Sequence, residues 1–160
     1  MRGRCSAAGW GRRIVFCILI VYVGFLAFQK QKSRVPFSTV QKEVMETADT
    51  GSLQQGSGQD FKRFYGLNEK DYAGFSFYYT NQSMGVEEIL LVSSEDTEKM
   101  EEAQQAAEKR IQTQLQNFEG YGEEQTKLLR DAVVAKKGDF FLMAVSPSAD
   151  EIKNKFLEIV

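Results

Sequence analysis

The chain has 160 residues, a length that fits one domain with a tail, and its formal net charge of −2 is distributed unevenly. Residues 1–34 carry seven basic and no acidic side chains, whereas residues 35–160 carry thirteen basic and twenty-two acidic ones, a net charge of −9. Because there is no histidine and both cysteines (Cys5 and Cys17) precede residue 35, the composition excludes His-based triads, His-ligated zinc and cysteine chemistry in residues 35–160. The acidic part also lacks the basic footprint of a nucleic-acid-binding protein, so no nucleic-acid partner is expected.

An uninterrupted apolar run, Ile14–Phe28, lies between basic residues near the N-terminus. At about 1.5 Å per residue it reaches roughly 22 Å, less than the roughly 30 Å of a hydrocarbon core. The basic residues Arg13 and Lys30 can reach the headgroups and compensate for the short length. The sequence therefore predicts a signal-anchor transmembrane helix over residues 14–30.

Two alternatives to this anchor stay open. A cleaved signal peptide fits the length, but no small-x-small cleavage site is present, since Phe25 lies two residues before Ala27. A buried helix of a cytosolic domain does not account for a wholly apolar run flanked by seven cations.

The basic residues also predict an orientation. Four arginines precede the run and three basic residues follow it, which favours a cytoplasmic N-terminus. We therefore expect a single-pass protein of the cell membrane, with a cytoplasmic basic tail (1–13), the anchor (14–30), a juxtamembrane linker (31–35) and an extracytoplasmic domain (36–160).

The domain begins with alternating helical and polar segments. Apolar residues at helical spacing after Pro36 predict a helix over about 36–48. Residues 49–59 are rich in Gly, Ser and Gln and are expected to form a loop. A short helix capped by Asp60 and ended by Gly66 should follow.

The next segments have the period of β-strands. Apolar and smaller or polar residues alternate over 72–80, which predicts a half-buried strand. Residues 81–85 (NQSMG) have turn composition, and residues 86–92 (VEEILLV) predict a second strand. The two strands should form an antiparallel hairpin.

The longest predicted helix starts at a cap on Ser93 or Ser94 and ends at Gly120. One apolar stripe follows its length: Met100, Ala103, Ala107, Ile111, Leu115 and Phe118.

Three further elements complete the domain. A helix is expected from Glu123 to Gly138, then a strand buried on both sides over Phe140–Val145, then a helix with a capping box of Ser148 and Glu151. The order of elements predicts an α+β fold with a small three-stranded sheet and helices packed on it.

Three blocks of this sequence carry a resemblance to a known family. Residues 77–93 (FYYTNQSMGVEEILLVS), 118–125 (FEGYGEEQ) and 137–145 (KGDFFLMAV) resemble the domain of unknown function 4358 (DUF4358) family of Gram-positive bacteria, over roughly residues 36–160. The resemblance implies an exported protein that is lipid-anchored or held by one N-terminal helix. This chain is similar to the second kind, because it lacks the lipid-attachment cysteine. No activity and no catalytic residue are implied.

The residues themselves indicate no catalytic, cofactor-binding or metal site. Glu87 and Glu88 are adjacent on a strand and point to opposite faces, so we expect one solvated glutamate and one near a helix end. Glu95, Asp96 and Glu98 lack the ligand spacing and glycine of a calcium loop and fit the start of a helix.

A possible surface for a ligand or partner is formed by Tyr78, Asn81, Met84 and Tyr121. Tyr78 should lie on the sheet face opposite to its aromatic neighbours, and Tyr121 in a turn, so neither is required by the core. Asn81 also begins an N-glycosylation triplet, and Met84 lies in the same predicted loop.

Three hypotheses follow. The first is a non-enzymatic binding or accessory module of the cell envelope, which contacts the membrane through residues 14–30 and another envelope protein or wall polymer through its domain. The alternative is a carboxylate- or serine-dependent enzyme acting on cell-wall glycan or its acyl groups. A regulator that signals through residues 1–13 is the third.

Overall fold

The computed structural model describes residues 35–160, so the predicted tail, anchor and most of the linker lie outside the described residues. No helix within 35–160 combines the length and apolarity needed to cross a membrane. The helices are α2 (Phe37–Thr47), α3 (Gly58–Tyr65), α4 (Thr97–Phe118), α5 (Glu123–Arg130) and α6 (Ala149–Ile159). The strands are β1 (Gln54–Gln55), β2 (Gly74–Tyr79), β3 (Glu88–Ser93), β4 (Val133–Lys137) and β5 (Phe140–Val145).

The α+β fold class is confirmed, but the prediction of three strands is wrong. The strands of the described residues form one five-stranded antiparallel sheet in the order β1-β2-β3-β5-β4. The hairpin of β2 and β3 is as expected. The two added strands lie at the edges: β1 within the predicted polar loop, and β4 within the predicted helix from Glu123 to Gly138.

The predicted helix from Glu123 to Gly138 is in fact the short helix α5 followed by strand β4. Helix α5 ends at Arg130, and Val133 and Ala135 then point to one face of the sheet while Val134 points to the other. Gly138 does not end a helix. It lies with Asp139 in the two-residue connection between Lys137 and Phe140, where its φ of 57° favours glycine.

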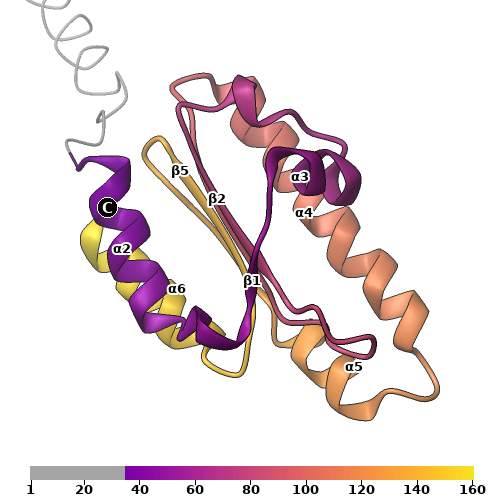
Figure 1. The fold of residues 1–160 in the computed structure, drawn as a ribbon. Helices are drawn as coiled ribbons and strands as arrows, with labels where there is room; N and C mark the ends of the chain where they lie inside the picture. Colours follow the sequence, from indigo (N-terminus) through magenta and orange to yellow (C-terminus); the bar gives the residue numbers. More distant parts are fainter. Residues whose placement is uncertain (1–34) are drawn as a thin grey trace, which may run out of the picture. The chain divides into compact units, whose positions relative to one another are not determined.

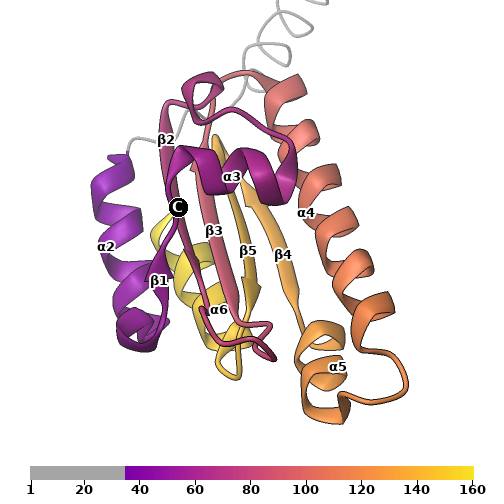
Figure 2. The ribbon, with the colours of Figure 1, turned by 45° about the vertical axis from the view of Figure 1, so that its right-hand side comes forward.

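Helices cover both faces of the sheet (Figures 1 and 2). Helices α3, α4 and α5 pack with one face and α2 and α6 with the other, so the domain has two apolar cores. Strands β3 and β5 are buried along their whole length because both of their faces are covered, which confirms the prediction for Phe140–Val145. The predicted apolar stripe of α4 is also confirmed, with Leu115 partly buried at its edge.

Helix caps differ from the expectations in detail. Ser57 is the N-cap of α3 and forms a capping box with Asp60, so Asp60 is not the cap itself. Asp96, rather than Ser93 or Ser94, caps α4. Ser148 is the N-cap of α6, but its side chain makes no capping hydrogen bond, so the expected box with Glu151 does not form.

The strand register defines two ends of the sheet. Gly74, Ser93 and Phe140 lie at one end, where the ring of Phe37 stacks on Phe140 with centroids 6.2 Å apart. We call this the Phe37 end, and the chain enters the domain here. Tyr79, Glu88, Val133 and Val145 lie at the opposite end, which carries the β2–β3 loop with Met84 and is called the Met84 end. The α4–α5 corner lies at the Met84 end in both ribbon views (Figures 1 and 2).

Candidate functional site

Glu88 is the one charged residue among 35–160 that is buried, with 4% of its surface exposed. It is the first residue of β3 and lies on the same sheet face as Leu90 and Val92, under α4. Glu87 is partly exposed, and Glu88 lies against Tyr65 at the end of α3, but its burial in the core was not expected. A buried carboxylate needs compensating partners, since removing a charge from water costs several kcal/mol.

Arg110 of α4 supplies the opposite charge. Its Nη2 donates to Oε2 of Glu88 at 2.9 Å, and its Nε donates to the same carboxylate at 3.2 and 3.3 Å. The arginine side chain is 17% exposed, and its guanidinium carbon lies 4.4 Å from the ring centroid of Phe64. Two-point bonding and stacking on an aromatic ring fix the guanidinium in one orientation.

Tyr65 of α3 completes the arrangement. Its hydroxyl donates to Oε1 of Glu88 and lies 3.9 Å from the sulfur of Met143. Burial, followed by the negative charge of Glu88, raises the pKa of Tyr65 well above its ordinary value. Tyr65 is therefore a neutral donor at physiological pH. We call Tyr65, Glu88 and Arg110 the Glu88 cluster. The hydrogen bonds of Tyr65 and Arg110 to the Glu88 carboxylate join α3, β3 and α4.

A polar pocket lies beside the Glu88 cluster at the Met84 end, with a volume of about 350 Å³. Glu88 and Arg110 form part of its wall, and the other lining residues come from β1, α3, β2, the β2–β3 loop and α4. Those lining residues are Gln54, Phe64, Tyr79, Thr80, Asn81, Gln82, Gly85, Val86, Glu87 and Gln114. Four of them carry side-chain amides, so the pocket presents paired hydrogen-bond donors and acceptors.

The predicted ligand surface is divided between separate places. Asn81 lines the polar pocket, and Met84 is 52% exposed in the same loop. Tyr78 is half-buried on the α2 face, where it lines another hollow of about 510 Å³. Tyr121 is 65% exposed after α4, with its ring centroid 5.7 Å from that of Phe118. Tyr78 and Tyr121 thus belong to opposite faces of the sheet.

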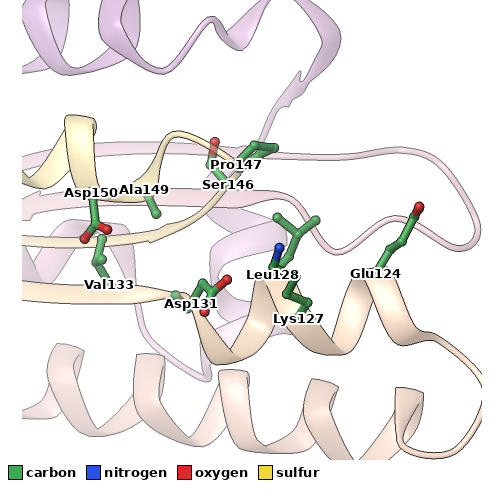
Figure 3. Close-up of a pocket in the computed structure, with 10 residues that line it drawn as sticks. Glu124, Lys127, Leu128, Asp131, Val133, Ser146, Pro147, Ala149 and Asp150 are labelled. Atoms are coloured by element: carbon green, nitrogen blue, oxygen red, sulfur yellow. The ribbon is translucent and has the colours of Figure 1, made fainter.

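A larger hollow of about 680 Å³ lies between α5 and the start of α6 (Figure 3). Glu124, Lys127 and Asp131 approach it from the α5 side, and Ser146 and Asp150 from the β5–α6 side. The hydroxyl of Ser146 is 3.1 Å from that of Ser148 and also accepts from the Ser148 amide. Within residues 35–160, no group of three or more acidic or cysteine side chains is arranged to hold a metal ion.

The sequence analysis did not identify Tyr65 or Arg110 as partners of Glu88, although two signals indicated the pairing of Arg110 with Glu88. Arg110 follows Ala107 by three residues and therefore lies beside the apolar stripe of α4. Glu88 is two residues before Leu90, on the buried face of a strand. A cation next to one buried stripe and an anion on a facing buried strand are expected to pair.

A family model described as "Domain of unknown function (DUF4358)" matches residues 46–146, a range that contains the whole Glu88 cluster and every residue that lines the polar pocket. Neither a curated protein nor a solved structure shows significant similarity to the chain.

Proposed function

Because the chain belongs to the DUF4358 family, whose description assigns no activity, we propose a function from the residues themselves. The protein is a membrane-tethered, extracytoplasmic binding module of a Gram-positive cell envelope. Residues 14–30 anchor it, residues 1–13 stay in the cytoplasm, and the domain binds another envelope protein or a wall polymer without catalysing a reaction.

The observation that carries the binding role is the Glu88 cluster. A general acid or base must lie within hydrogen-bond reach of the proton that it transfers to or from the substrate. Glu88 is only 4% exposed, and its carboxylate is held by Arg110 and Tyr65. The cluster therefore serves to fix one wall of the polar pocket, as a binding site requires.

The two ends of the sheet differ in the groups that they expose to a partner. The chain enters at the Phe37 end, whereas the polar pocket and the exposed Met84 lie at the Met84 end, and the exposed Tyr121 lies in the α4–α5 corner. We therefore propose the Met84 end as the surface that contacts the partner.

Localisation is tested first, with the full chain in cells. After the wall is removed, externally added protease should degrade residues 36–160 of the membrane-bound protein while a cytoplasmic marker stays intact. A protected domain, or a soluble form that lacks the first thirty or so residues, would contradict the anchored arrangement.

Binding is tested by recovering the full chain from solubilised membranes and identifying what accompanies it. We expect a reproducible partner or wall fragment that is reduced for Met84→Ser combined with Tyr121→Ser. Lys136→Ser on β4, an exposed residue that pairs with Phe141 near the Phe37 end, is the matched control. Equal recovery with all three proteins would show that the Met84 end is not the binding surface.

The enzymatic alternative has a direct test of its own. Purified full chain is incubated with acetylated and unacetylated wall glycan, and released acetate and sugars are measured. Turnover that is abolished by Ser146→Ala or Asp131→Asn, both in the hollow beside α5, would replace the binding module with an enzyme.

A further inference from the structure

We propose that the polar pocket binds one neutral, hydroxyl-rich sugar ring of a glycan. This inference rests on the proposed binding function and specifies the ligand class of the same site. It follows from the charge, the hydrogen-bonding groups, the apolar wall and the size of the pocket, which are taken in turn.

The charge of the pocket favours a neutral ligand. Its charged lining residues are Glu87, Glu88 and Arg110, and the last two neutralise each other. Glu87 is partly exposed at the rim and adds a single negative charge near solvent. An anionic group such as phosphate would meet no uncompensated cation here, and burying an unpaired ligand charge is costly.

The hydrogen-bonding groups suit hydroxyls. Gln54 on β1, Asn81 and Gln82 in the β2–β3 loop, and Gln114 on α4 each carry an amide with two donors and an acceptor. A sugar hydroxyl is also both donor and acceptor, so each amide can bond a hydroxyl in either direction. Three separate elements contribute these amides, and they therefore surround a ring rather than follow an extended chain.

One wall of the pocket is apolar. The rings of Phe64 and Tyr79 lie with centroids 5.1 Å apart, and Val86 lies beside them in the lining. Arg63 and Arg110 both stack on Phe64, whereas Tyr79 is partly exposed. Since the two guanidinium groups lie over Phe64, Tyr79 offers the aromatic face, and an aromatic side chain with a few polar groups is the usual composition of a small-molecule site.

The size and rigidity of the pocket limit the ligand to one ring. Its volume of about 350 Å³ is near the lower end of the range for small-molecule sites, about 300–1,000 Å³. Arg110 cannot leave the wall without breaking its bonds to Glu88, and the backbone amide of Thr80 donates to the backbone carbonyl of Glu87 at 2.9 Å across the loop. A wall that is ordered before binding lowers the entropic cost of association.

The test uses the five methionines of the full chain as probes. The protein, in a detergent without a sugar headgroup, is labelled with ¹³C at the methionine methyl groups. Chitotriose, a neutral trimer of N-acetylglucosamine, is added up to millimolar concentration. We expect a saturable shift of the Met84 signal, next to the pocket, and no shift of the Met45 signal on α2.

Matched variants assign the shift to the pocket. Gln54→Ala and Gln114→Ala should each raise the apparent Kd about fivefold, the effect of one lost hydrogen bond. Gln55→Ala and Gln112→Ala are the controls, because Gln55 pairs with Tyr78 on the other face and neither residue lines the pocket. Equal effects of targets and controls would overturn the proposal.

Three further probes distinguish the ligand classes. The cationic glucosamine trimer, the anionic galacturonate trimer and the uncharged peptide N-acetyl-glycyl-glycine amide are titrated in the same way. Preferential binding of a charged sugar or of the peptide, or no Met84 shift with any sugar, refutes the proposal of a neutral-sugar site. A partner still recovered from membranes would then leave the binding module standing, whereas a cytosolic domain would remove the proposed function whatever chitotriose does.

Discussion

The guanidinium of Arg110 holds the carboxylate of Glu88 at two points, with Nη2 2.9 Å from Oε2, and so joins the middle of α4 to the first residue of β3. This contact lies at the Met84 end, between the α4-side core and the polar pocket. It couples the stability of the domain to the shape of its candidate binding site, and several predictions rest on it.

Loss of Arg110 should destabilise the domain strongly. Arg110→Met leaves the buried Glu88 carboxylate without its cation, which costs about 3–5 kcal/mol of unfolding free energy. Arg63→Met is the matched control, because Arg63 also stacks on Phe64 but is 65% exposed, and its loss should cost less than about 1 kcal/mol. Urea unfolding of the full chain in detergent, followed by near-ultraviolet circular dichroism, measures both.

A double variant separates the lost attraction from the stranded charge. Adding Glu88→Gln to Arg110→Met removes the unpaired carboxylate while keeping an oxygen that can accept from Tyr65. The double variant should therefore be more stable than Arg110→Met alone. Additive losses from the two substitutions would indicate that the charges do not interact.

Stability should fall in alkaline solution. Burial raises the pKa of Tyr65 well above its ordinary value, and burial with nearby Glu102 and Asp71 raises the pKa of Tyr72 to about 12. Above pH of about 10 the unfolded tyrosines lose protons that the folded ones retain, so the unfolding free energy declines as pH rises towards the folded pKa values.

The measurement is urea unfolding between pH 8 and 11.5 for the wild type and for Tyr65→Phe with Tyr72→Phe. The Tyr65→Phe, Tyr72→Phe variant should be less stable than the wild type at pH 8, because it lacks the hydrogen bonds to Glu88 and to the Lys99 carbonyl. Its unfolding free energy should depend less on pH than that of the wild type. Parallel pH profiles for the two proteins would contradict the assignment.

Gly56 should not tolerate a side chain. It follows β1, its amide donates to the Phe77 carbonyl at 2.8 Å, and a Cβ there would overlap the Phe77 ring. Gly56→Ala should cost about 1–3 kcal/mol through displacement of the ring or of β1. At Gly51 the nearest atom to an added Cβ is 3.7 Å away, so Gly51→Ala is the control and should change the melting temperature little.

Gly138 tests the β4–β5 turn. Its φ of 57° lies in the left-handed region, so Gly138→Ala should cost about 1 kcal/mol, whereas Gly138→Asn should cost less because asparagine adopts that region more readily. Thermal unfolding of the two variants compares them. The same order of stability would be found if Gly138 were the C-cap of a helix. Amide hydrogen exchange distinguishes a hairpin turn from a helix cap. If Gly138 forms the turn that holds β4 to β5, Gly138→Ala should reduce the protection of the β4 amides that pair with β5.

Several elements could be predicted because their signal is local. The α4 stripe from Met100 to Phe118 has helical spacing, and the alternation over β2 has the period of a strand. The wholly apolar run Phe140–Val145 correctly indicated burial on both faces. In each case the pattern of apolar residues indicates directly which faces of the element are buried.

The sequence by itself determined the α+β class, the β2–β3 hairpin and the family blocks, since these depend on short-range patterns. Only the tertiary structure decided that Val133–Lys137 is a strand, because its apolar residues also fit a helix and pairing with β5 selects the extended form. The burial of Glu88 was likewise decided in three dimensions. A carboxylate becomes a core residue only when Arg110 and Tyr65, 22 and 23 residues away along the chain, are brought to it.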